Sequence, residues 1–244
     1  MKFLKLISIL FLLQGCSSNY EWGLYILSPD NIEGLTNLKF LISGITTTIY
    51  ISIVSIIISI ILGLLVAIPS LAKSKFLTYL NIGYVEIVRA IPLLVLILWI
   101  YYGLPIMTGI SFSPFVSGII ALSISESAFQ AEIFRAGINS IKKSQWEAGS
   151  SLGLSFFRKL KLVILPQAIK NILPAIGNQF VYVLKMSSLV SIIGIGDLTR
   201  KANELVVTTY RPLEIYTFLI LEYLILILFV SYLVRKLEKK LQKD

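Results

Sequence analysis

Long apolar runs, interrupted by short polar segments, set the pattern of this chain. Residues 40–72 contain no charged side chain, and about 20 apolar residues are enough for a helix to cross the hydrocarbon core of a bilayer. Comparable runs predict five membrane-spanning segments in all, at 46–68, 79–101, 114–138, 174–196 and 212–234. Backbone polar groups inside a bilayer must be satisfied within the chain, and no alternating strand pattern competes, so these segments should be helices. The predicted fold class is all-α, a polytopic integral membrane protein with about five core transmembrane helices.

The order of these segments predicts one membrane domain with short flanking segments. Residues 1–16 have the pattern of a signal segment, 17–39 are expected outside the membrane, 40–236 form the transmembrane domain, and 237–244 form a cytoplasmic tail. The second and third spans carry more charge than the first, but Pro105, Gly109 and Pro114 mark the turn between them. Only 14% of the residues are charged, against about 25% in soluble domains, so a soluble protein is not expected.

Lysine and arginine are unevenly distributed among the segments between the spans. The chain has 22 of them against 13 acidic residues, a net charge of +9. They gather after the first span, around the segment between the third and fourth spans, and in the tail: Lys73, Lys75, Arg135, Lys142, Lys143, Arg158, Lys159, Lys161, Lys170, Arg235, Lys236, Lys239, Lys240 and Lys243. The positive-inside rule places these regions in the cytoplasm and the amino end outside. Because the charges are scattered over separate loops, they predict attraction to anionic lipid and no binding of nucleic acid.

The amino end has two open interpretations. Lys2 and Lys5 precede an apolar run at 6–13 that is too short to span and is typical of a signal-peptide core. Residues 13–16 resemble the lipobox of bacterial lipoproteins, which implies lipidation of Cys16 on the outer side of the membrane. Cys16 is the only cysteine, so it cannot form a disulfide within the chain. The alternative is an uncleaved apolar anchor with an incidental cysteine.

A polar segment between the third and fourth spans has the signals of a short helix. Ser144 and Glu147 have the spacing of a capping box, which predicts that a helix starts there. Gly153 can adopt the left-handed conformation that ends a helix, and Ser155 can cap a second helix running toward Pro166. A short helix lying across a loop is suited to docking another protein. An ordinary amphipathic interfacial helix is the alternative.

This segment resembles the EAA loop of ABC-transporter permease subunits. The family pattern is Glu-Ala-Ala, three residues, Gly, nine residues and Ile-x-Leu-Pro, and here Gly149 replaces the second Ala while Val163 replaces Ile. The resemblance implies a cytoplasmic coupling helix that sits in a cleft of the ATP-binding subunit. The coupling residues are then Glu147, Ala148, Gly149, Leu152, Gly153, Leu165 and Pro166. Gly149 is expected to loosen the helix by up to roughly 1 kcal/mol relative to Ala.

Three further segments narrow the resemblance to the permeases for polar amino acids. They lie at 84–94, 127–138 and 184–191, in the same order as in that family. The resemblance implies a permease subunit of an ATP-driven importer in the bacterial inner membrane. It also implies its partners: cytoplasmic ABC ATP-binding subunits, a second permease subunit that is identical or homologous, and a periplasmic or anchored amino-acid-binding protein. That binding protein largely sets specificity, so the amino acid carried stays open.

Charged side chains inside the spans are candidates for the transport pathway, because they are costly in a bilayer and tend to face a cavity or a partner. Glu126, Lys185 and Glu222 are the candidates, with the hydroxyl pair Ser187 and Ser188 beside the lysine. Lys185 is expected to pair with a carboxylate of a neighbouring helix, Glu126 or Glu222, or with the carboxylate of a substrate. A charge pair that only locks two helices together is the alternative.

Two further acid and base pairs are expected to be structural. Glu86 and Arg89 stand three residues apart, as do Glu132 and Arg135. Residues at this spacing lie on one face of a helix and can form ion pairs. Both pairs fall toward the cytoplasmic ends of their spans, where burial is less costly.

The sequence lacks the residues of most catalytic sites. No Gly-x-x-x-x-Gly-Lys-Ser/Thr phosphate loop occurs, so we expect the energy for transport to come from a separate ATPase subunit. There is no histidine, the usual general base and a common zinc ligand, and we expect no catalytic residue, metal or cofactor. A membrane enzyme that uses Glu126 and Glu132 is a weaker alternative. A secondary transporter or channel is the other, although it would have no use for an EAA loop.

Overall fold

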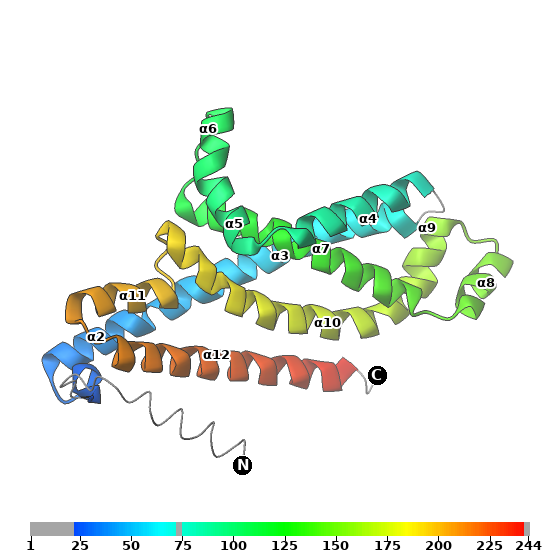
Figure 1. Ribbon diagram of the computed structural model, residues 1–244. Coiled ribbons are helices and arrows are strands. Elements are labelled where there is room, and N and C mark those ends of the chain that lie inside the picture. The colour runs from blue at the N-terminus through cyan, green and yellow to red at the C-terminus, as the bar shows by residue number, and fades with distance from the viewer. Residues whose placement is uncertain (1–21, 72–74, 242–244) are drawn as a thin grey trace, which may run out of the picture.

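The computed structural model describes residues 22–71 and 75–241, and all regular structure in these ranges is helical (Figure 1). The long helices are α3 (Gly44–Leu71), α4 (Lys75–Ala90), α7 (Pro114–Asn139), α10 (Leu165–Met186) and α12 (Pro212–Leu241). The shorter elements are η1 (Leu24–Leu27), α2 (Ile32–Ile42), α5 (Leu93–Leu98), η2 (Trp99–Gly103), α6 (Leu104–Thr108), α8 (Lys143–Ser151), α9 (Phe156–Lys159), η3 (Leu160–Ile164), η4 (Ser187–Ile193) and α11 (Leu198–Thr209). The all-α prediction is confirmed. The signal-like segment and Cys16 lie outside the described residues.

Three helical stretches of the described residues are long and apolar enough to cross a bilayer, namely Ile32–Ile68, Phe156–Ile193 and Pro212–Lys240. The bent pair Lys75–Ala90 and Leu93–Thr108 meets the same criteria as one unit. These four overlap the predicted first, fourth, fifth and second spans. The predicted third span is α7, whose 26 residues are about 39 Å long but carry several charges. Because α7 packs against α3, α4, α5 and α10, neighbouring helices cover the polar side chains in its middle, such as Glu126 and Gln130.

The helices α3 and α7 pack along most of their length, and small side chains allow them to approach closely. On α3 the buried face carries hydroxyl side chains at helical spacing: Thr48, Ser52, Ser55 and Ser59. One turn further on, a Cβ atom added to Gly63 would lie 2.5 Å from Cβ of Gln130 and 2.9 Å from the backbone of α7. Small residues at membrane helix interfaces bring the backbones together and so increase van der Waals contact. Gly63 therefore marks the closest approach of these two helices.

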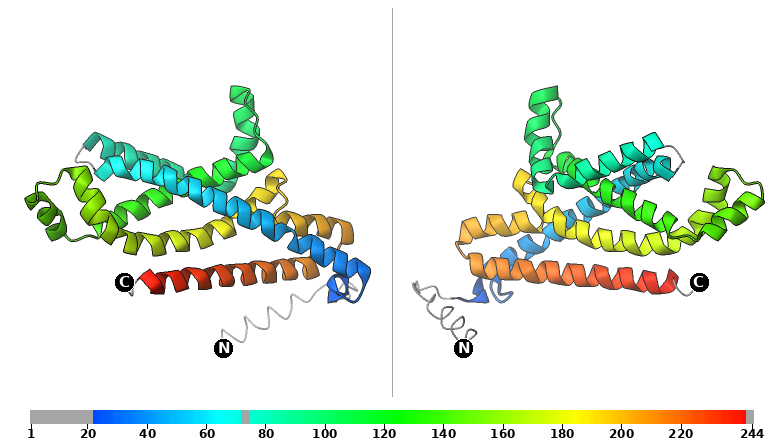
Figure 2. Two further views of the ribbon diagram at one scale, coloured as in Figure 1. Left: turned by 180° about the vertical axis from the view of Figure 1, so that it is seen from behind. Right: turned by 45° about the vertical axis from the view of Figure 1, so that its right-hand side comes forward.

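The second predicted span is broken. The helix α4 ends at Ala90, α5 begins at Leu93, and the two axes differ by 91°. Pro92 accounts for the break, because it has no N–H to donate and its ring disfavours helical dihedrals at Ile91. From α5 the chain continues into α6, which stands away from the other helices (Figure 2). The predicted second span, 79–101, is therefore helical but is interrupted at Pro92.

The turn between the second and third spans is confirmed. Gly109 ends α6 with a φ of 71°, in the left-handed region that glycine adopts without strain. Ser113 is the N-cap of α7, where its Oγ accepts a hydrogen bond from the backbone N–H of Val116 at 3.4 Å, and Pro114 occupies the first turn. Cap and proline together define where α7 begins.

The carboxyl-terminal half contains one helix that the hydropathy pattern did not predict. The helix α11 lies between η4 and α12, in the interval between the predicted fourth and fifth spans. Asp197 caps it by accepting the N–H of Arg200 at 2.9 Å. Its buried residues Leu198, Ala202 and Leu205 recur every three or four positions, a helical period that could have predicted it. The helices α10 and α12 pack side by side (Figure 1), and α10 starts at Leu165, earlier than the predicted span.

Candidate functional site

The polar segment between α7 and α10 forms α8, which projects beyond the ends of the neighbouring long helices (Figure 1). The predicted helix is present, but its predicted cap is wrong. The N-cap is Lys142, and no side chain makes a capping hydrogen bond there. Glu147 does not reach back to Ser144; its carboxylate lies 3.5 Å from Nζ of Lys143, and both side chains are mostly exposed. An exposed pair of this kind contributes little to stability.

The end of α8 is a complete hydrogen-bonded stop. Gly153 has a φ of 67°, which confirms the predicted left-handed position. The N–H of Gly153 donates to the carbonyl of Ser150 at 2.9 Å, and the N–H of Leu154 donates to the carbonyl of Gly149 at 3.2 Å. These are the two bonds of a Schellman motif, which satisfies carbonyls that a helix end leaves free. The direction in which the chain leaves α8 is therefore fixed by Gly153.

Contacts with the following helices hold α8 in place. The ring of Trp146 stacks on Phe156 with centroids 6.0 Å apart and planes 20° apart. The side chain of Gln167, in the first turn of α10, donates to the side chain of Gln145 at 3.2 Å. Stacked aromatic pairs add to the stabilisation from burial. The contacts join α8 to α9 and to the start of α10, so these elements can move as a unit.

Gly149 permits the close approach of α8 to α9. A Cβ atom added there would lie 2.9 Å from Cγ and 3.0 Å from Cδ of Lys159. The lysine stem runs past the glycine, and its Nζ donates to Oγ of Ser150 at 2.7 Å. An alanine at this position would have to displace the lysine stem. Local packing against Lys159 thus explains why glycine and not alanine stands at this position of the Glu-Ala-Ala pattern.

The outer surface of α8 and of the turn that follows exposes apolar side chains. Leu152 is 76% exposed and Phe157, in α9, is 68% exposed. Ala148 and Glu147 are exposed on the same helix, whereas Leu165 and Pro166 lie at the start of α10 and do not belong to α8. Phe157 was not predicted as a site residue, although an aromatic residue in a polar loop is a signal for a contact surface.

The carboxylate of Glu126 lies in the interior, in contact with α10. Glu126 is fully buried, and Nε2 of Gln179 donates a hydrogen bond to Oε2 of Glu126. Lys185, by contrast, is exposed on α10 and has no carboxylate partner among the described residues. Both carboxylate oxygens of Glu222 are buried and have no hydrogen-bond partner among the residues that the structure describes. Among the described residues Lys185 therefore pairs with neither Glu126 nor Glu222, and its pairing with a substrate carboxylate stays a prediction.

The two serines after Lys185 bond back to their own helix. Oγ of Ser187 donates to the carbonyl of Leu184 at 2.9 Å, and Oγ of Ser188 donates to the carbonyl of Lys185 at 2.8 Å. Hydroxyls engaged in this way offer no donor to a ligand. They lie where α10 tightens into the 3₁₀-helix η4, and so serve the local turn.

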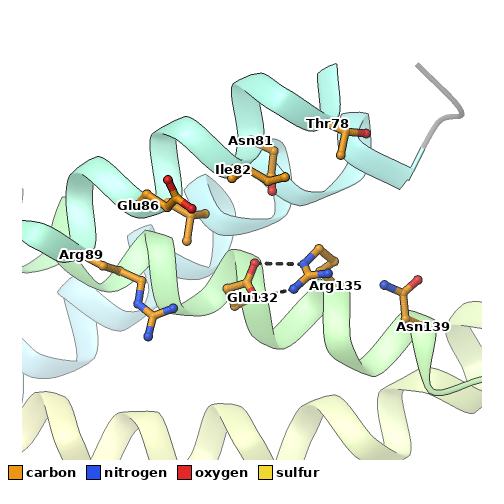
Figure 3. A pocket seen from close by; sticks show the side chains of 9 residues that line it. Thr78, Asn81, Ile82, Glu86, Arg89, Glu132, Arg135 and Asn139 are labelled. Atoms are coloured by element: carbon orange, nitrogen blue, oxygen red, sulfur yellow. Dashed lines mark hydrogen bonds and ion pairs between the residues drawn. The ribbon is translucent and has the colours of Figure 1, made fainter. Parts of the chain in front are cut away.

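A polar pocket of about 450 Å³ opens between α4 and α7 (Figure 3). It is lined by both of the acid and base pairs that were predicted to be structural, and also by Asn81 and Asn139. On α7 the prediction is correct, because the Arg135 guanidinium donates twice to the Glu132 carboxylate, at 2.7 and 2.9 Å.

On α4 the prediction is wrong. Arg89 does not pair with Glu86 but lies over the ring of Phe129, with its Cζ 4.9 Å from the ring centroid. Glu86 has no ion pair in the part of the chain that the structure describes. The pocket thus contains one bidentate ion pair, and the positive charge of Arg89 also acts on the Glu132 carboxylate of that pair (Figure 3).

A buried carboxyl group at the opposite end of the molecule was not predicted. Asp197 is fully buried and caps α11, and its Oδ2 lies 3.5 Å from the hydroxyl of Tyr223. Burial raises the pKa of the Asp197 carboxyl to about 6, because the charged form loses hydration. The next residue is held as well, since the N–H of Leu198 donates to Oγ1 of Thr48 at 3.2 Å.

Comparisons with known sequences give one consistent result. Residues 59–243 match the family described as binding-protein-dependent transport system inner membrane component. The arginine transport system permease protein ArtQ of Bacillus subtilis is 34% identical over 218 residues, 89% of this chain and 100% of the relative. The probable glutamine ABC transporter permease protein GlnM of the same organism is 38% identical, over 85% of this chain and 96% of the relative. The glutamine transport system permease protein GlnP of Escherichia coli K12 is 32% identical, over 84% of this chain and 94% of the relative.

Solved structures share the fold. A chain of the crystal structure of an amino acid ABC transporter with histidines superposes with a TM-score of 0.79 at 38% identity, and the match covers 84% of this chain and 96% of that one. A chain of the inward-facing MetNI methionine ABC transporter superposes with a TM-score of 0.73, covering 83% of this chain and 96% of that one. Its identity is 19%, so this second likeness concerns the fold alone.

Proposed function

Because this chain belongs to the family of binding-protein-dependent transport system inner membrane components, we propose that it is the membrane-spanning permease subunit of an ATP-binding-cassette importer for polar amino acids. The named relatives are described as permease proteins of arginine or glutamine transport systems, GlnM as a probable one, and the chain covers nearly all of their length. That coverage supports the same substrate class for this protein. The binding protein then determines which amino acid is delivered.

The observation that carries this proposal is the exposed, tethered helix α8. It stands beyond the membrane helices and ends in a fixed turn at Gly153. Leu152 at its C-cap and Phe157 in the following helix α9 are exposed to solvent. Exposed apolar side chains on a rigid projection are suited to a pocket on another protein. We assign α8 as the coupling helix, and a cytoplasmic ATP-binding subunit as the protein that receives it.

The contacts of α8 supply a route for motion into the membrane domain. Stacking of Trp146 on Phe156 joins α8 to the segment that leads into α10, and the bond from Gln179 to Glu126 joins α10 to α7. A displacement of α8 on ATP binding would then shift α10 against α7 as a rigid body. Closure of paired ATPase subunits would in this way alternate access to the pathway.

The remaining partners follow from the same assignment. A second permease subunit, identical or homologous, completes the pathway, and a periplasmic or anchored amino-acid-binding protein delivers substrate from outside. The distribution of lysine and arginine supports an outer amino end and a cytoplasmic carboxyl end. The ATPase is a separate subunit. Residues 1–16 act as a signal-like segment, with Cys16 as the candidate for lipidation.

Uptake by the complete complex tests the proposal. The permease would be reconstituted with its ATPase and binding-protein partners in liposomes that contain ATP or ADP. Radiolabelled L-arginine, L-glutamine, L-histidine and L-glutamate are the probes, with L-leucine as the apolar comparison. We expect ATP-dependent uptake of at least one polar amino acid. No uptake of any probe would refute the substrate class, and uptake without the ATPase would indicate a secondary transporter.

A further inference from the structure

An apolar groove lies between α10 and α12, near the carboxyl end of α12. The two helices are closest at Gly177, where an added Cβ atom would lie 2.6 Å from Cγ1 of Val234. The groove extends from this contact along both helices, with a volume of about 480 Å³. Apart from one acid and one base, the residues that line it are apolar, and Leu173 and Leu237 among them are 42% and 62% exposed. The described residues thus leave an apolar hollow uncovered.

The groove lies at the depth where α12 leaves the hydrocarbon core of the membrane. The twelve residues before Arg235 carry no charge, whereas four of the six residues from Arg235 to Lys240 are basic. Lysine and arginine near the end of a span reach the level of the headgroups. On the orientation proposed above, these are the headgroups of the cytoplasmic leaflet. The apolar part of the groove, beside Val234, is therefore level with lipid acyl chains, and its end at Lys240 is level with lipid phosphates.

Two lysines from different helices stand at the same depth beside the charged end of the groove. Lys170 precedes Gly177 by seven residues on α10, and Lys240 follows Val234 by six residues on α12. Because the two helices run in opposite directions (Figure 1), both lysines lie about 9–11 Å beyond the helix contact, on the same side of it. Lys170 is exposed and shares the face of α10 that carries Leu173 and Gly177. Packed helices are about 8–10 Å apart, so one phosphate can lie between the two lysine side chains.

The charges of the groove match a phospholipid with one net negative charge. Lys170 and Lys240 stand against a single acid, Glu238, and none of the three has an ion-pair partner among the described residues. An ammonium group donates hydrogen bonds to phosphate oxygens, and a carboxylate accepts hydrogen bonds from hydroxyl groups. A glycerol headgroup supplies a phosphate and hydroxyls together, whereas a choline headgroup has no N–H or O–H to donate.

A second copy of this chain is a poorer occupant of the groove. A twofold interface brings the same patch of both subunits together. Here it would place two clusters of Arg235, Lys236, Lys239 and Lys240 opposite each other. Like charges opposed across an interface disfavour association, whereas an anionic lipid neutralises the cluster.

We propose that the groove between α10 and α12 binds an anionic phospholipid of the cytoplasmic leaflet, of the phosphatidylglycerol class. One acyl chain lies along Leu173 and Leu237, and the phosphate lies between Nζ of Lys170 and Nζ of Lys240. The headgroup hydroxyls donate to the carboxylate of Glu238. The lipid fills the space that the two helices leave beyond their contact and so holds the end of α12 against α10. The site depends on the proposed orientation in the membrane and not on the proposed substrate class.

Photo-crosslinking tests the site on the full-length chain, in complex with its ATPase, in phosphatidylcholine nanodiscs. The probe is phosphatidylglycerol with a diazirine in one acyl chain, and the comparison reagents carry the same chain on phosphatidylcholine and phosphatidylethanolamine. Peptide mass spectrometry then locates the labelled residues. We expect labelling at 173–177 and 234–237 to be at least about fivefold stronger with phosphatidylglycerol, the size of effect expected for a single lysine near an anionic surface. Equal labelling by all three reagents, or labelling spread over all membrane helices, would overturn the proposal.

Two double variants separate a defined site from a diffuse attraction. Lys170→Gln with Lys240→Gln should lower the labelling by phosphatidylglycerol to the level of phosphatidylcholine. Lys236→Gln with Lys239→Gln removes the same charge from residues that do not line the groove, and it should keep most of the preference. Equal losses in the two double variants would show only a diffuse attraction to anionic lipid and would overturn the site.

Two further measurements distinguish other occupants of the groove. Excess glycerol 3-phosphate, which has the headgroup chemistry without acyl chains, should not reduce the labelling. Displacement by this compound would mean that the lysines bind a soluble phosphate and would overturn the lipid assignment. Native mass spectrometry of the Lys170→Gln, Lys240→Gln variant should find permease subunits paired as in wild type. Loss of the pairing with unchanged labelling would make the groove a subunit interface instead.

Discussion

Replacement of Gly153 tests how much the turn that ends α8 contributes to the coupling between the permease and its ATPase. Gly153 has a φ of 67°, and an added Cβ atom would meet nothing within 4 Å. Any penalty for a larger side chain therefore comes from the backbone conformation and not from a clash. The left-handed region costs an L-residue about 1–2 kcal/mol, and a β-branched residue lies at the upper end of that range. At about 1.4 kcal/mol for each factor of ten, Gly153→Val should lower the affinity for the ATPase roughly 5- to 30-fold.

The matched control is Gly153→Asn, because asparagine tolerates the left-handed region better than other non-glycine residues. Affinity would be measured by titrating the ATPase onto the permease in nanodiscs, and transport by uptake in proteoliposomes. We expect the valine variant to insert into the membrane normally, since the site lies outside the packed helices. Wild-type affinity and uptake in the valine variant would show that the turn at Gly153 does not govern docking. Equal losses in both variants would exclude the backbone explanation.

Four other predictions follow from the buried and exposed charges and from the amino end. Because Lys185 has no carboxylate partner in the described part of the chain, Lys185→Met should change the free energy of unfolding by less than about 0.5 kcal/mol. Uptake should fall while basal ATP hydrolysis persists. Normal uptake in this variant would mean that the lysine side chain contacts only water. Gln179→Leu should destabilise the protein by about 1–3 kcal/mol, because it leaves the Glu126 carboxylate without its hydrogen-bond donor. Adding Glu126→Leu to this variant should restore much of the melting temperature. A double variant that melts no higher than Gln179→Leu would refute the hydrogen bond between Gln179 and Glu126. Burial raises the pKa of Asp197 to about 6, so the stability that protonated Asp197 contributes is complete below about pH 4 and is lost as the pH rises through 6. The melting temperature of Asp197→Asn should therefore rise relative to wild type between pH 4 and pH 7, by the equivalent of up to about 3 kcal/mol. A difference in melting temperature that does not change with pH would contradict this. Mass spectrometry should find a diacylglyceryl group on Cys16 and no residue before it, whereas an intact Met1 would establish the anchor interpretation.

Features that depend on one residue's backbone were predicted well from the sequence. The left-handed conformation of Gly153 and the turn at Gly109 are both present, because glycine adopts positive φ at little cost wherever a chain must turn. The position of Ser155 as the N-cap of α9 is also as expected, although its side chain makes no capping hydrogen bond. These are local requirements, and the local sequence is enough to state them.

Features that depend on packing were predicted less well. The start of α8 is set by its contacts with α9 and α10, such as the stacking of Trp146 on Phe156, and the expected cap at Ser144 plays no part. The break at Pro92 was missed because hydropathy measures how apolar a segment is and does not show whether its helix is continuous. The orientation of Arg89 toward Phe129 depends on a helix distant in sequence. The partner of Lys185 could not be found within the chain, because none is present among the described residues.

The close approach of α3 and α7 at Gly63 also limits where this membrane domain can deform. With the α7 backbone 2.9 Å from a would-be Cβ atom, the two helices have no clearance to slide or tilt past one another. Closely packed interfaces resist small displacements, so α3 and α7 act as a stiff frame. The contacts of α10 with α7 are less extensive and include a buried hydrogen bond from Gln179 to Glu126. The flexible part of the membrane domain is thus the side connected to α8. A force applied to α8 displaces α10 before it deforms the packed pair of α3 and α7.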